Sequence, residues 1–274
     1  MRTRRSILCK RDELLSIRAE LFPVVEVVID AIISLLSMSV SMPLLQQFYT
    51  NNTVITLLHC LQCHMFPLSP MQRSLLDEDP ENAFWTLSNS CYRQKLFSLY
   101  EILLRLFPHL IVQVISSTYQ NLASASESSV YGLLCFLQRG GSSIADQINY
   151  NDMVSHVLLP LLREDVTPSL VIECASVISS CFYLFDDQLR GSLIGSVVSI
   201  THHPSVAVRL AGIGCLTQLL DGSPMSVSVI LHCFEEILNQ IVFLFKVGNR
   251  YWKTNRLQLH RSRRTICSHC VNCW

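Results

Sequence analysis

The chain has 274 residues, of which 50% are hydrophobic and 15% charged, and its mean hydropathy is +0.34. This composition excludes a disordered chain, and the 9 Gly and 10 Pro exclude a collagen-like or linker sequence. The formal net charge of zero hides a division, because residues 12–245 carry nine basic and 21 acidic side chains, a net charge of −12. An acidic body disfavours direct binding of nucleic acid and favours basic protein partners.

The chain begins with a basic segment over residues 1–19, which includes the start of a first helix. The most apolar stretch follows over residues 24–45, and it contains Glu26, Asp30 and Pro43. Its part without charge or proline, residues 31–42, is shorter than the ~20 residues that span a bilayer. We therefore expect a buried helix here and no membrane span. The 12 cysteines lie mostly in apolar runs, which is typical of small buried side chains in a reducing compartment.

Residues 20–245 have the apolar spacing of helices almost throughout, with apolar side chains recurring three and four residues apart. Prolines stand where many of these runs begin, a position at which a helix tolerates proline. Two apolar faces are predicted, and they consist of Leu96, Leu99, Tyr100, Leu103, Leu104 and Phe107, and of Leu210, Ile213, Leu216, Thr217 and Leu220. The spacing predicts about ten to twelve helices in antiparallel pairs.

An internal repeat occurs in the second half of the chain. The segment PSLVIECA at residues 168–175 aligns with PSVAVRLA at residues 204–211, an offset of 36 residues. This offset accommodates a helix, a turn, a second helix and a turn. We therefore predict an all-α fold, an α-solenoid of antiparallel helix pairs of the HEAT or armadillo kind.

The pattern Pro204-x3-Val208-Arg209-x-Ala211-x4-Leu216 resembles the first helix of a HEAT repeat. This resemblance implies that Val208 and Ala211 face the packed interior, together with Leu216, and that Arg209 lies at the boundary between repeats. The family often carries an aspartate at the position of Ser205, so its ladder of arginine and aspartate is incomplete here.

A longer stretch resembles the middle of the importin-beta family of nuclear transport receptors, most of all the group around the eleventh importin. The similarity is carried by CLQCHMFPLSP at residues 60–70, LDEDPENAF at 76–84 and YRQKLFSLYEILLRLFPHL at 92–110. It implies a central fragment of a receptor that imports protein cargo, with nuclear-pore FG repeats and the GTPase Ran as further partners. Such receptors occupy the nucleus, the cytoplasm and the nuclear envelope. The N-terminal region that binds Ran in the family is not identified in this chain. The alternative is another HEAT or armadillo scaffold without a transport role.

Four acids, Asp77, Glu78, Asp79 and Glu81, are the candidate contacts for a basic cargo segment. Pro70 and Pro80 disfavour a continuous helix through this stretch, so the acids are expected to project from a loop. The alternative interpretation is that they are solvated loop residues without a partner.

No catalytic signature is present: the sequence lacks GxSxG, HExxH, a phosphate loop and GxGxxG, and we predict neither enzymatic activity nor a cofactor. Residues 246–274 form a basic Cys/His-containing tail that we expect to be irregular, and intron-derived or alternative sequence is one explanation for it. A weak candidate zinc site within it consists of Cys267, His269, Cys270 and Cys273. The similar group Cys60, Cys63 and His64 is expected to belong to a buried helix face.

Overall fold

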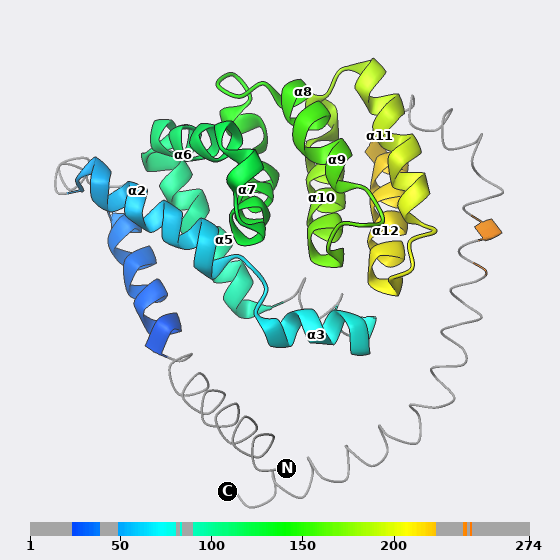
Figure 1. The fold of residues 1–274 in the computed structure, drawn as a ribbon. Helices are drawn as coiled ribbons and strands as arrows, with labels where there is room; N and C mark the ends of the chain where they lie inside the picture. Colours follow the sequence, from blue (N-terminus) through cyan, green and yellow to red (C-terminus); the bar gives the residue numbers. More distant parts are fainter. Residues whose placement is uncertain are drawn as a thin grey trace, which may run out of the picture.

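The computed structural model describes residues 24–38, 49–80, 83, 90–222, 238–239 and 242, and every regular element within them is helical (Figure 1). The prediction of an all-α chain is confirmed over these residues. Besides a helix over residues 24–38, the α-helices are α2 (Asn51–Cys60), α3 (Pro70–Glu78), α5 (Cys91–Leu106), α6 (Pro108–Gln120), α7 (Glu127–Gly140), α8 (Tyr150–Met153), α9 (Leu159–Leu161), α10 (Pro168–Cys181), α11 (Asp187–Ile200) and α12 (Val206–Gly222). Short 3-10 helices are η3 (Leu122–Ser124), η4 (Gly141–Ile144) and η6 (Phe182–Leu184), and π-helical turns are η2 (Leu61–Met65) and η5 (Val154–Leu158).

The helix starts follow from local sequence. Pro70, Pro108 and Pro168 each occupy the first position of a helix, where the missing N–H has no intrahelical partner. Ser69 completes a capping box in front of α3, since its hydroxyl accepts from the Gln72 backbone N–H and the Gln72 side chain accepts in return. The prediction that prolines mark helix starts is confirmed at these positions.

Each of the two π-helical turns ends two positions before a proline. The backbone N–H of Phe66 donates to the Leu61 carbonyl ahead of Pro67, and that of Leu159 donates to Val154 ahead of Pro160. A proline inside a helix clashes with the carbonyl four residues earlier. At Pro160 the wider turn moves that carbonyl aside and the helix continues into α9, whereas the helix before Pro67 ends at Met65.

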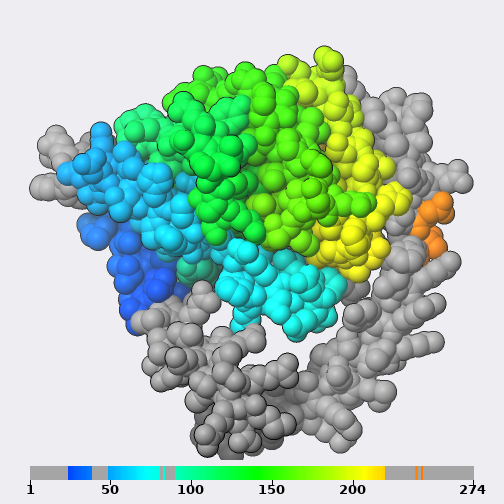
Figure 2. Space-filling model, in the orientation of Figure 1, coloured from blue at the N-terminus to red at the C-terminus, as the bar shows by residue number. Residues whose placement is uncertain are grey.

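Three helices form a row across the molecule, as Figure 1 shows: α10 packs against α7 on one side and against α12 on the other. Helix α7 also contacts η2, α5 and α6, whereas α11 packs on α12. Helix α3 lies against α10, and in Figure 2 it forms the cyan edge beside the green and yellow helices. The row of α7, α10 and α12 therefore has one face that is bordered by α3.

The core between α5, η2 and α7 is aromatic. The rings of Tyr100 and Phe136 stack with centroids 4.6 Å apart, and Phe66 meets Phe136 edge-on at 5.9 Å. The Tyr100 hydroxyl donates to the Phe136 carbonyl at 3.0 Å, so this buried polar group is satisfied. The apolar face predicted for α5 is confirmed, since all six of its residues are buried.

Of the face predicted for α12, Leu216 is buried as expected, but the other described residues of that face are not, so its predicted orientation is wrong. Leu210 and Ile213 are half-buried and Thr217 is exposed. The residues that are buried are Ala207, Val208, Ala211, Cys215, Leu216 and Leu219. Apolar residues surround this helix almost completely, so their spacing cannot select a face. The small residues select it instead, because they let the neighbouring helices approach.

Helices α5 and α6 are joined by Phe107 and are bent by 111° relative to each other. Only as this bent pair do they reach the length and apolar composition of a membrane span. Within the described ranges, no single helix is both long and apolar enough to cross a membrane.

Candidate binding pocket

A pocket of about 270 Å³ opens on the face of the helix row, between α3, α5, α7, α10 and α12. Its apolar wall consists of Leu68, Leu76, Phe97 and Ile172. Its polar wall consists of Arg93, Tyr131, Gln138, Arg139, Ser169, Glu173, Ser176 and Gln218. The pocket thus combines an apolar half with a half that is rich in hydrogen-bonding groups.

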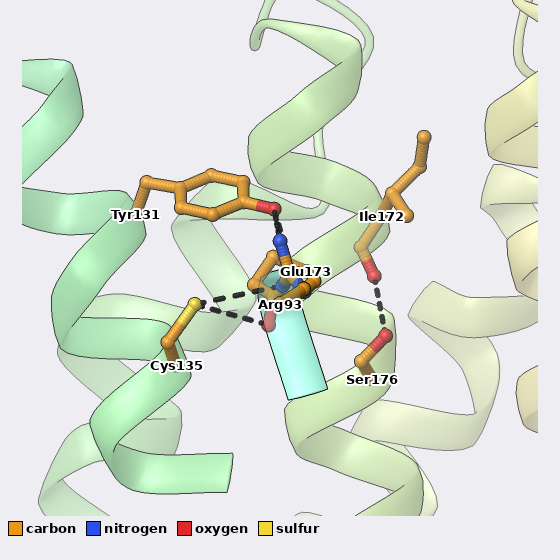
Figure 3. Close-up of polar contacts among 6 residues, drawn as sticks. All are labelled: Arg93, Tyr131, Cys135, Ile172, Glu173 and Ser176. Carbon is orange, nitrogen blue, oxygen red and sulfur yellow. Dashed lines mark hydrogen bonds and ion pairs between the residues drawn. The ribbon is translucent and has the colours of Figure 1, made fainter. Parts of the chain in front are cut away.

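An ion pair forms part of the wall of the pocket, and it joins two helices that are far apart in sequence. The Nη2 atom of Arg93 on α5 lies 2.6 Å from Oε2 of Glu173 on α10 (Figure 3). The side chain of Glu173 is only 5% exposed and that of Arg93 is 15% exposed. A charge-assisted contact of this length is among the stronger hydrogen bonds in proteins.

Two residues of α7 complete this cluster, and Figure 3 shows both projecting toward Glu173. The Tyr131 hydroxyl accepts from Nη1 of Arg93 at 2.8 Å and donates to Oε2 of Glu173 at 3.0 Å. The Cys135 thiol donates to Oε1 of Glu173 at 3.4 Å. Both carboxylate oxygens therefore have partners, and the cluster joins α5, α7 and α10.

Burial and charge set the protonation of this cluster. Burial, the largest single influence, would lower the pKa of Arg93, but the charge of Glu173 together with the contributions of Tyr131 and Cys135 outweighs it, and the net result is a raised pKa. Burial, followed by the Glu173 charge, raises the pKa of the Tyr131 hydroxyl and of the Cys135 thiol. Arg93 is thus held charged, while Tyr131 and Cys135 stay neutral donors. A neutral thiol is a poor nucleophile, so the cluster is suited to stabilising the helix packing and to binding a ligand.

Arg139 lies at the rim of the pocket and differs from Arg93 in its partners. Its Cζ lies 4.0 Å from the centre of the Phe97 ring, a cation–π contact. The nearest carboxylate oxygen, Oε1 of Glu101, is 4.0 Å away, which is beyond hydrogen-bonding distance. The side chain is 41% exposed. Two guanidinium groups and one carboxylate give the described pocket lining a net positive charge within the acidic body of residues 12–245.

The structure places two of the predicted cargo acids, Asp77 and Glu78, on a helix and not in a loop. Asp77 and Glu78 are exposed in the last turn of α3, and Asp79 is the residue that ends this helix. The prediction of a loop is wrong because Pro70 starts a helix while Pro80 only limits its end. Glu81 lies outside the described residues.

The predicted repeat-packing residues lie in α12, which packs on α10. Val208, Ala211 and Leu216 are buried, and Arg209 is half-buried. Burial lowers the pKa of Arg209.

The candidate zinc ligands Cys267, His269, Cys270 and Cys273 lie outside the described residues, as do the terminal segments 1–19 and 246–274. The expected burial of the second Cys/His group is wrong, because Cys60 and His64 are exposed and Cys63 is half-buried. The part of the chain that the structure describes holds no group of three His, Cys, Asp or Glu residues arranged for a metal ion.

The ion pair in the pocket wall was missed by reasoning from sequence. Glu173 is the only charged residue within α10, in the otherwise apolar and small-residue sequence PSLVIECASVISSC. A single acid in such a helix indicates a buried partner, because an unpaired buried charge is costly. That signal marks Glu173, but it does not identify Arg93, which is 80 positions away.

Comparison with known proteins finds no family model, no curated protein and no solved structure that matches the chain.

Proposed function

We propose that the chain is a helical-repeat scaffold that binds other proteins and has no enzymatic activity. The observation that carries this proposal is the packing of α10 directly against α12. These helices contain the two segments that are related by the 36-residue offset. In repeat proteins, equivalent helices of successive repeats stack side by side in this way. Helix α7 extends the row on the other side of α10.

The small residues of the two segments support the same proposal. Ala175 on α10 and Ala211 on α12 occupy matching positions in the repeat and are both buried. A Cβ atom at Gly212 would lie 3.1 Å from Cγ1 of Ile200 in α11, tighter than ordinary van der Waals contact. Small side chains at these points let α12 approach its neighbours closely, which a stacked array requires.

Within this class, we propose a fragment of a nuclear transport receptor that mediates protein import. The support is the resemblance of residues 60–110 to the importin-beta family, together with the net charge of −12 over residues 12–245. Its proposed partners are basic cargo, nuclear-pore FG repeats and, in the longer receptors of the family, Ran. It would then act in the nucleus, the cytoplasm and at the nuclear envelope.

One observation favours the alternative, a HEAT or armadillo scaffold without a transport role. The pocket on the helix row carries a net positive charge, whereas a surface dedicated to basic cargo would carry acids there.

Binding to immobilised peptides separates the two possibilities. One peptide contains several Phe-Gly dipeptides, and its control contains Ser-Gly at the same places. A transport receptor retains the first peptide and releases the second, and GTP-loaded Ran is tested in parallel. Equal binding to both peptides would reject the transport proposal and leave the general scaffold.

A further inference from the structure

We infer that the pocket between α3, α5, α7, α10 and α12 binds an acidic side chain of a partner protein, an Asp or Glu next to an apolar residue, with Arg139 as the group that holds the carboxylate. The inference rests on the proposed scaffold function for one point only, namely that the occupant is a protein segment. The pocket itself is defined by its lining residues and its charge.

The charge of the pocket comes from unequal pairing of its two arginines. Arg93 is neutralised by Glu173 at 2.6 Å and also donates to Tyr131. The ion pair of Arg139 is much longer, since its Nη1 atom lies 4.0 Å from Oε1 of Glu101, beyond hydrogen-bonding distance. Arg139 is therefore the cation of the pocket whose donors remain available to a ligand.

The orientation of Arg139 suits a carboxylate. The guanidinium lies against the face of the Phe97 ring at 4.0 Å, and this contact limits its rotation. Stacking occupies the face of the planar group and leaves the N–H groups at its edge free. That edge matches the two oxygens of a carboxylate in a bidentate pair.

The remaining lining defines what accompanies the carboxylate. Leu68, Leu76 and Ile172 provide an apolar wall opposite the polar groups, and Leu68 and Leu76 are buried. The volume of about 270 Å³ lies just below the range of roughly 300–1,000 Å³ that is typical of small-molecule sites. This size fits one or two side chains of a peptide better than a cofactor.

The fixed carboxylate of Glu173 argues against a phosphate group in the pocket. The lining carries two guanidinium groups and one carboxylate, so it balances a single negative charge. A phosphate that carries more than one charge would meet repulsion from Glu173, and among the described lining residues the only other cation, Arg93, is already paired with Glu173. A basic side chain would be repelled by Arg139.

A selection of random short peptides displayed on phage tests this inference with the purified full chain. We expect the enriched peptides to share an Asp or Glu beside Leu, Ile, Met or Phe. Individual peptides are then synthesised, and their Kd is measured by fluorescence anisotropy. A second form of each peptide, with Gln or Asn in place of the acid, should bind about tenfold more weakly or not at all.

Three variants locate the binding. Arg139→Gln should weaken the acidic peptides about tenfold or more, and Arg139→Lys should restore only part of the loss because lysine lacks the planar fork. Arg105→Gln is the matched control, since it removes an exposed arginine of α5 that does not line the pocket, and binding should persist. Circular dichroism and urea unfolding of each variant establish that the fold is retained.

The other outcomes each reject the inference in a recognisable way. Enrichment of peptides without an acid, or of acidic peptides that bind Arg139→Gln as tightly as the original chain, would leave the scaffold function and remove this pocket from it. Binding of inorganic phosphate to the chain, without any enrichment of acidic peptides, would assign the pocket to a small anion. If no peptide is enriched, the pocket assignment is rejected, while the scaffold proposal still rests on the packing of α10 against α12.

Discussion

Glu173 on α10 and Arg93 on α5 are 80 positions apart in sequence, yet their side chains meet at 2.6 Å behind the pocket. The contact is supported by Tyr131 and Cys135 of α7, so it joins three helices through one carboxylate. The contact therefore fixes the spacing of these helices, and it also neutralises the charge of Arg93. The second role leaves Arg139 as the cation that gives the pocket its sign.

Removing one partner of this pair should destabilise the fold. Glu173→Leu leaves the Arg93 guanidinium largely buried without its counter-ion, and we expect a loss of about 3 kcal/mol in the free energy of unfolding. Urea unfolding at neutral pH measures this loss. The double variant Arg93→Met with Glu173→Leu should recover much of it, because neither charge is then left unpaired. A double variant as unstable as the sum of the two single ones would contradict the importance of the pairing.

A glycine at a close helix contact should be irreplaceable. A Cβ atom at Gly132 on α7 would collide with the carbonyl oxygen of Gln62 in η2. Gly132→Ala should therefore cost about 3 kcal/mol or more, since the clash involves backbone and cannot be relieved by a rotamer change. Gly195→Ala on α11 is the control, because a Cβ atom there meets open space. It should stabilise the fold by about 0.5–1 kcal/mol, and a similar melting temperature for both variants would refute the packing of α7 on η2.

A charge in the buried face of α12 should disrupt its packing against α10. Ala211 is 6% exposed, so Ala211→Asp buries a carboxylate and should cost about 3 kcal/mol or more. Thr217→Asp places the same group at an exposed position of the same helix and should have little effect. Thermal unfolding followed by circular dichroism compares the two. If Ala211→Asp melts as the original chain does, the proposed repeat alignment is wrong.

The acids at the end of α3 should contribute to binding and not to stability. A basic peptide is expected to bind the full chain at low salt and to weaken markedly near ~0.5 M salt, where exposed charges are screened. Replacing Asp77, Glu78, Asp79 and Glu81 by Asn or Gln should reduce this binding. The same change should leave the melting temperature unchanged or slightly higher, because acids at a helix C-terminus oppose its dipole. Equal peptide binding by the variant would assign the cluster to solubility.

Stability should fall at alkaline pH through buried thiols. Burial raises the pKa of Cys181 and of Cys215 from 9.0 to about 12. These thiols stay protonated in the folded chain and ionise in the unfolded chain, so stability is full below about pH 9 and is lost as the pH rises toward 12. Each thiol should contribute about 1.4 kcal/mol per pH unit in this window.

Urea unfolding under reducing conditions at a series of pH values measures this slope. Cys215→Ala should reduce the slope, whereas Cys91→Ala, which removes an exposed thiol, should not. An unchanged slope in Cys215→Ala would show that other groups govern the alkaline loss.

The sequence predicts the helices far better than it predicts their contacts. The face of α5 was predictable because its apolar residues recur with helical spacing and are separated by charged or polar ones, such as Arg93 and Lys95. The face of α12 was not, because apolar residues occur on all sides of that helix. The acids of α3 were misplaced because two prolines were both taken as breaks, although Pro70 starts a helix.

The pocket was beyond prediction for a related reason. Arg93, Arg139 and Glu173 come from three helices, and their separation is set by how those helices stack. The lone acid of α10, Glu173, indicates a buried partner, but the sequence contains many Lys and Arg residues that are candidates for this partner. The decision between Arg93 and the others depends on tertiary packing, which local spacing does not encode.

The π-helical turn before Pro160 has a consequence for where the protein tolerates the deletion of a residue. Such a turn contains one residue more than the α-helical turn it replaces, as an insertion of one codon would leave it. Deleting one residue within 154–158, together with Pro160→Ala, restores a regular turn between α8 and α9. The side chains on both sides keep their original faces. Elsewhere in a helix the same deletion would rotate the side chains beyond it out of the core. The π-helical turn is therefore a place where the chain can lose one residue and still keep its core side chains in position.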